Sequence, residues 1–126
     1  MVSLAGAMDV DSTCATDKPF TFLQIHGVAD KTIKIDGGIL NGHQYTSAAE
    51  TLSRVATVNK CSQNSSNPAA FSKKDFDPSI KGSETTVFTF SHCLKPVTYW
   101  RIARGAHSPK LPANYADQIL RYLANL

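Results

Sequence analysis

The sequence predicts an α/β domain with a mostly parallel sheet, an antiparallel hairpin and flanking helices. Residues 20–25 form an aromatic and branched run with little polar alternation, which is typical of a strand buried on both faces of a parallel sheet. Apolar residues then repeat at helical spacing over 47–59. Two further strand-like runs, 85–90 and 97–102, are joined by a short polar link that favours a hairpin.

The remaining elements follow in chain order. Residues 2–7 are apolar and predict a buried strand that ends at a small-residue turn. Ser47, with Glu50 three residues later, predicts the start of the helix, because a serine side chain caps free backbone N–H groups there. Residues 62–83 are rich in Ser, Asn, Pro, Lys and Asp and predict a long surface loop. A last helix is predicted over 114–125.

Length and composition limit the classes of protein to consider. The 126 residues, 42% of them hydrophobic, predict one domain over 1–126. The 13 Lys and Arg are scattered and the formal net charge is +3, which gives nucleic-acid binding little support. No apolar stretch approaches the ~20 residues that cross a bilayer, so we expect no membrane association. The opening residues lack the basic start of a signal peptide, so we expect a mature form or an excised piece.

The cysteines leave two interpretations open. Cys14, Cys61 and Cys93 form no C-x-x-C pair, and none has histidine at zinc-finger spacing, so we expect no structural zinc. We expect no other metal and no cofactor. In an exported protein, an odd count predicts one bridge and one thiol without its partner. The count alone is equally compatible with three reduced, buried thiols in a cytosolic protein.

Two residues are candidates for chemistry. Asp30 follows His26 and Gly27 directly after the strand at 20–25, and open α/β sheets keep functional groups just beyond the C-terminal ends of their strands. His107 lies on a glycine loop after the last strand, where an imidazole can act as general base and then as acid. Taken alone, each has a simpler explanation, a turn-capping Asp and an exposed loop histidine.

The order of the two residues strengthens the argument. Hydrolases with a G-x-S-x-G nucleophile elbow carry nucleophile, acid and histidine in that order along the chain. Asp30 precedes His107, and each follows a predicted strand.

At this point a family resemblance becomes specific. Residues 22–30 read Phe-Leu-Gln-Ile-His-Gly-Val-Ala-Asp and residues 33–38 read Ile-Lys-Ile-Asp-Gly-Gly, which resembles the acid-bearing segment of the polyhydroxybutyrate depolymerase and feruloyl esterase family. The resemblance implies a partial α/β-hydrolase fold, the C-terminal portion of that family's domain. It implies that Asp30 is the triad acid, that His107 is the triad histidine and that a disulfide joins Cys61 to Cys93. It also implies a secreted or periplasmic location.

The expected function is therefore the part of a carboxylic ester hydrolase that supplies the acid and the histidine. The substrates would be feruloyl or acetyl esters of plant polysaccharide, or hydroxyalkanoate polyesters. The nucleophile is not recognisable, because the chain contains no G-x-S-x-G, and neither Ser91 nor Ser108 has the strand–turn–helix setting that exposes one. The substrate-binding residues are unknown. We expect either a homo-oligomer or association with a missing N-terminal hydrolase portion.

Three other interpretations remain open. The chain can be a non-catalytic, self-associating module whose triad residues are relics. It can be a complete small esterase or lactonase with an unorthodox nucleophile. A metal site made of His26, Asp30 and His107 is chemically conceivable, but the hydrolase order explains the same residues more fully.

Overall fold

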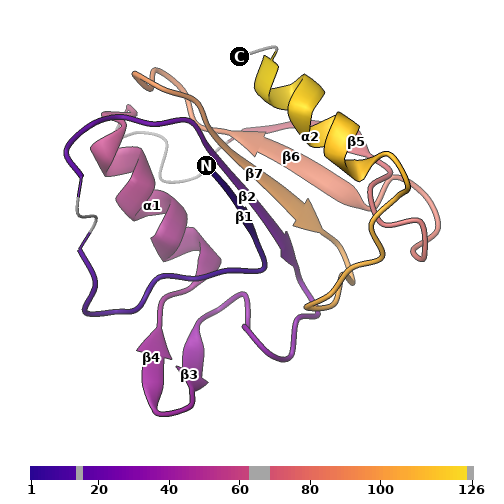
Figure 1. Ribbon diagram of the computed structural model, residues 1–126, viewed down its shortest axis with the longest axis horizontal. Helices are drawn as coiled ribbons and strands as arrows, with labels where there is room; N and C mark the ends of the chain where they lie inside the picture. Colours follow the sequence, from indigo (N-terminus) through magenta and orange to yellow (C-terminus); the bar gives the residue numbers. More distant parts are fainter. Residues whose placement is uncertain (14–15, 63–68, 125–126) are drawn as a thin grey trace.

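Figure 1 shows the computed structural model, which describes residues 1–13, 16–62 and 69–124. Its main sheet has the order β1-β2-β7-β6-β5 and consists of β1 (Val2–Leu4), β2 (Phe22–Gly27), β5 (Ala69–Lys74), β6 (Thr85–Thr89) and β7 (Val97–Ile102). A separate hairpin consists of β3 (Gly38–Leu40) and β4 (His43–Tyr45). The helices of the described part are α1 (Ala48–Val58) and α2 (Tyr115–Ala124).

The expectation of a partial α/β-hydrolase fold with a mostly parallel sheet and flanking helices is wrong. β1, β2 and β7 run parallel, whereas β6 and β5 are antiparallel to their neighbours, so the sheet is mixed. In the described residues the domain is mostly sheet, with the two helices named above. The expectation extended the character of one buried strand, 20–25, to the whole sheet. The predicted β6–β7 hairpin is present, and β5 adds a second antiparallel pair. The described sheet therefore has two parallel and two antiparallel strand pairs.

Strand β5 lies inside the segment 62–83, which the sequence predicts as a loop. It pairs antiparallel with β6, and its register shifts between Ala70 and Ser72. Lys73 and Lys74 occupy strand positions at the end of the sheet order, where charged side chains are common because they discourage pairing with other chains. The strand was missed because the prediction for this segment relied on its polar composition alone.

Strand β1 is also shorter and less buried than the expected strand over 2–7. It ends at Leu4, and its side chains at Val2 and Leu4 are 38% and 44% exposed. The cause is its place at the other end of the sheet, where β2 is its partner strand. Ala5 then takes a positive φ of 52°, which turns the chain away.

The helix expected over 47–59 is confirmed as α1. The Ser47 hydroxyl accepts a hydrogen bond from the Glu50 N–H at 3.0 Å, as its capping role requires. The last helix is confirmed as α2, within the predicted 114–125. No described helix has the length and apolar character needed to span a membrane.

Two buried apolar clusters lie on opposite faces of the sheet, because neighbouring strand residues point to opposite faces. Phe22 and Tyr99 pack with Leu52 of α1 on one face. Leu23 and Trp100 lie on the other face, where Ile119 and Tyr122 of α2 pack against their cluster. The helices therefore lie on opposite sides of the sheet, as Figure 1 shows.

Candidate catalytic site

The candidate site forms where β2 and β7 end. These strands are parallel neighbours, and their last paired residues are Gly27 and Ile102. The loops that follow them therefore leave the sheet side by side, at the C-terminal ends of the strands. Two backbone hydrogen bonds of 2.9 Å join the loops, from the Val28 N–H to the Ile102 carbonyl and from the Ala29 N–H to the Gly105 carbonyl. This edge, the C-terminal end of parallel strands, is where α/β sheets place functional groups.

The expected hydrogen bond between Asp30 and His107 is present. His107 Nδ1 lies 2.9 Å from Asp30 Oδ2, although the residues are 77 positions apart. The Asp30 side chain is fully buried, whereas the His107 side chain is 39% exposed. One end of the pair is thus fixed inside the protein and the other faces solvent.

The backbone around Asp30 is arranged to hold a negative charge. Asp30 Oδ1 accepts hydrogen bonds from the N–H groups of Thr32 at 2.8 Å and Ile33 at 2.9 Å. Burial by itself would raise the pKa of Asp30, but the hydrogen bond from His107 and those from the two backbone N–H groups outweigh it. The pKa of Asp30 therefore lies below its ordinary value, and the carboxylate is ionised at neutral pH.

His26 supports Asp30 from the interior. Its side chain is fully buried, and Nε2 lies 2.8 Å from the Ile33 carbonyl and 3.4 Å from Asp30 Oδ2. Since a carbonyl only accepts, Nε2 carries a hydrogen, and Nδ1 can accept from the Gln24 amide at 3.4 Å. His26 therefore bonds within its own turn and holds the loop that carries Asp30.

This geometry permits one kind of chemistry at His107. If Nδ1 donates its hydrogen to Asp30, Nε2 carries the lone pair and can take a proton from a hydroxyl group. Within the described part of the chain, no serine hydroxyl is hydrogen-bonded to His107. Ser91 follows β6, which runs antiparallel to β7, so it lies near the start of β7 and not near its C-terminal end. The catalytic roles of Asp30 and His107 stay predictions.

Sequence reasoning missed the residues that anchor the histidine loop. Asp77 is buried, and its Oδ2 accepts from the Lys110 N–H at 3.3 Å, three residues beyond His107. Glu84 Oε1 in turn accepts from the N–H groups of Phe76 and Asp77, at 2.9 and 2.8 Å. Burial would raise the pKa of Glu84, but hydrogen bonds from Thr85 and these backbone groups lower it. No local motif marks the contact between Asp77 and Lys110, because the two residues are 33 positions apart.

The other expected features are placed as follows. A disulfide joins Cys61 and Cys93, which confirms that pairing, and Cys14 lies outside the described residues. His43 and His92 are at the surface. Over residues 1–13, 16–62 and 69–124, no group of three or more His, Cys, Asp or Glu side chains is placed to hold a metal ion.

Comparisons of the chain with known proteins identify no relative. No protein-family model matches the chain, and searches of curated proteins and of solved structures find no significant match. The resemblance to the polyhydroxybutyrate depolymerase and feruloyl esterase family therefore stays a prediction.

Proposed function

We propose that this chain supplies the acid and the histidine of a serine-type carboxylic ester hydrolase. The observation that carries the proposal is the hydrogen bond between His107 Nδ1 and the buried Asp30 carboxylate. A carboxylate in this position fixes the tautomer of the imidazole and stabilises the imidazolium that forms during proton transfer.

Three further features support the pair as a working unit. The loops that carry it are joined by backbone hydrogen bonds, so its geometry does not depend on the two side chains alone. The Asp30 carboxylate has a lowered pKa and so keeps its charge at neutral pH. The His107 side chain is 39% exposed, so a substrate and a nucleophile can approach it.

The substrate class rests on the resemblance of residues 22–38 alone. It comprises feruloyl or acetyl esters of polysaccharide and hydroxyalkanoate polyesters. The Cys61–Cys93 disulfide suits an oxidising compartment, which supports a secreted or periplasmic location as part of the same proposal.

The test is an ester hydrolysis assay with matched histidine variants. Two samples would be assayed in parallel, this chain by itself and the native protein purified from its source. The substrates would be p-nitrophenyl acetate, p-nitrophenyl butyrate and methyl ferulate. His107→Gln should lower kcat/KM by about 10²–10⁴-fold, since general base catalysis contributes that much. Asp30→Asn should lower kcat more than it changes KM, because Asp30 orients the base and does not touch the ester.

His43→Gln is the control, because it removes a histidine whose side chain is exposed and distant in sequence from the pair. It should leave the rate unchanged. A fluorophosphonate run beside the assay should label one serine and abolish the rate. Hydrolysis that survives His107→Gln, or no hydrolysis in either form of the protein, would contradict the proposal.

A further inference from the structure

A concave site lies on the α1 face of the sheet, and its lining includes Val28, two residues before Asp30. It has a volume of about 710 Å³ and is bordered by β6, β7, the first turn of α1 and the segment before β3. Its apolar walls include Phe88, Phe90 and Leu52. The Phe88 ring stacks against Tyr99 with centroids 5.9 Å apart, so part of the wall is a flat aromatic surface. Such a surface suits a flat apolar ligand.

A cation without a partner lines the same cavity. Arg101 follows Tyr99 by two positions on β7, so both side chains project from the same face. In the described part of the chain, its guanidinium makes no ion pair and no side-chain hydrogen bond. Asp36 also lines the cavity, yet the two charged groups form no ion pair within 4.0 Å. An unpaired guanidinium beside an apolar wall is a docking point for a carboxylate.

Tyr99 adds an unsatisfied polar group. The residue is 7% exposed, and its hydroxyl has no hydrogen-bond partner among the described residues. Burial raises the pKa of Tyr99 to about 12, with smaller opposing effects from the charges of Arg101 and Asp36. The hydroxyl therefore stays protonated at neutral pH and can donate. A buried donor without an acceptor is costly, so a ligand oxygen at this point would be favoured.

We propose that this cavity binds an organic monocarboxylate with a flat apolar body. The apolar body packs between the aromatic wall and Leu52, and the carboxylate pairs with the Arg101 guanidinium, while the Tyr99 hydroxyl donates to it. Asp36 also lines the cavity, and its charge disfavours a second carboxylate on the ligand. Neither Asp30 nor His107 lines this cavity, so binding here does not depend on the ester hydrolase proposed above.

The test uses 2-naphthoate as the probe, with the neutral 2-naphthamide as its matched comparison. Calorimetry would give the dissociation constants, and NMR chemical-shift changes at Phe88, Tyr99 and Arg101 would locate the ligand. The naphthamide should bind at least about tenfold more weakly, because a hydrogen bond to a charged group contributes more than one between neutral groups. Arg101→Gln should weaken naphthoate binding by a similar factor and remove the preference for the acid.

Arg104→Gln is the control, since it makes the same charge change at an exposed residue that does not line the cavity. It should leave the affinity unchanged. Tyr99→Phe retains the ring and should weaken naphthoate binding about threefold or more while leaving naphthamide less affected. Thermal unfolding of each variant checks that the fold persists. Equal affinity for acid and amide, unchanged binding in Arg101→Gln, or shift changes outside the cavity would each overturn the proposal, as would no binding at millimolar concentration.

Discussion

The backbone of Gly27 at the end of β2 lies directly against the backbone of Gly105 after β7, with no room for a side chain between them. A Cβ atom at Gly27 would be 2.1 Å from the Gly105 carbonyl oxygen, and one at Gly105 would be 3.0 Å from the Gly27 Cα. This contact holds the two loops together at the edge of the sheet. It is what brings Asp30 and His107 within hydrogen-bond distance.

The first prediction concerns this contact. Gly27→Ala should lower the free energy of unfolding by about 3 kcal/mol, because the colliding atoms belong to backbone and cannot rotate away. It should also separate Asp30 from His107, which would appear as changed imidazole NMR signals. Gly6→Ala is the control: its Cβ would meet the Ser3 hydroxyl, which can rotate, so the cost should stay under about 1 kcal/mol. Equal urea midpoints for the two variants would contradict this account.

The second prediction concerns the pH dependence of stability. The pKa of Asp30 is lower in the folded chain than its ordinary value of 3.8, so the unfolded chain binds the proton more readily. The stability that Asp30 contributes is therefore present above that value and is lost as the pH falls below about 5 towards the folded pKa. Asp30→Asn should flatten the decline in unfolding free energy between about pH 5 and pH 2. Urea titrations at several pH values measure the slopes, and identical slopes would refute the assignment.

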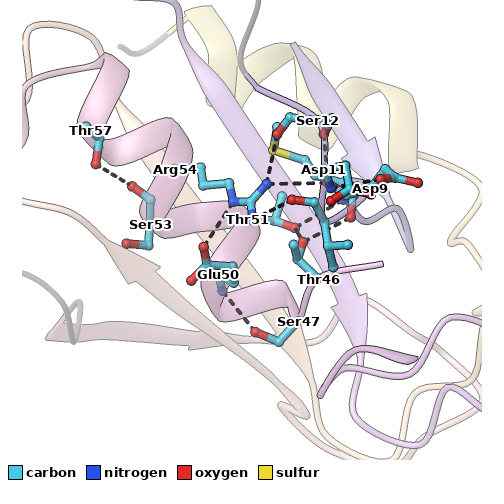
Figure 2. Close-up of polar contacts among 12 residues, drawn as sticks. Asp9, Asp11, Ser12, Thr46, Ser47, Glu50, Thr51, Ser53, Arg54 and Thr57 are labelled. Atoms are coloured by element: carbon cyan, nitrogen blue, oxygen red, sulfur yellow. Dashed lines mark hydrogen bonds and ion pairs between the residues drawn. The ribbon is translucent and has the colours of Figure 1, made fainter. Parts of the chain in front are cut away.

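The third prediction concerns Arg54, which fixes the segment between β1 and β2 to helix α1 (Figure 2). Its guanidinium donates to the carbonyl oxygens of Asp9 at 3.3 Å, Val10 at 3.2 Å and Ser12 at 2.9 Å, and also to the Glu50 carboxylate at 3.0 Å. A lysine lacks the planar fork that reaches several acceptors together. Arg54→Lys should therefore lower the free energy of unfolding by about 1–3 kcal/mol and expose this segment to proteolysis.

Glu50→Gln separates the ion pair from the carbonyl contacts. The Glu50 side chain is 52% exposed, so the pair should contribute less than about 1 kcal/mol. We expect Glu50→Gln to leave both the urea midpoint and the protease sensitivity close to those of the unmodified protein. A larger loss with Glu50→Gln than with Arg54→Lys would show that the ion pair, and not the carbonyl contacts, holds the segment.

The fourth prediction concerns the disulfide between Cys61 and Cys93. It closes a loop with a sequence separation of 32. In the chain-entropy model such a loop contributes about 3–4 kcal/mol, because the bridge restricts the unfolded chain. The double variant Cys61→Ser/Cys93→Ser should lose that amount of unfolding free energy, and its stability should no longer respond to dithiothreitol. A double variant as stable as the oxidised protein would contradict the prediction.

How much the sequence predicts depends on the range of the interactions involved. The cap at Ser47 and the β6–β7 hairpin were predicted correctly, because each depends on neighbouring residues. The β3–β4 hairpin was missed although Asn41-Gly42 is a strong turn signal, and both residues do take positive φ. Asp30 and His107 were singled out as a pair from their order along the chain and the family resemblance, because the local pattern around each is weak when taken alone.

Interactions between distant segments account for the rest. The sheet is mixed because β5 and β6 add antiparallel strands beside β7, and no local pattern in residues 62–83 indicates that pairing. The anchoring of the histidine loop by Asp77 depends on a contact with Lys110, 33 residues away. The contact between His26 and the Ile33 carbonyl also depends on the folded shape of the turn that joins them, which the sequence pattern does not specify.

The ¹⁵N NMR spectrum of His107 tests the central claim most directly, because it reports which ring nitrogen carries the hydrogen in the unliganded protein. If Asp30 orients His107 as a general base, Nδ1 of the neutral ring should be protonated and bonded to the carboxylate, and Nε2 should be unprotonated. Asp30→Asn should abolish this preference, whereas His43→Gln should leave it intact. A His107 ring protonated on Nε2, or one whose signals do not respond to Asp30→Asn, would contradict the account.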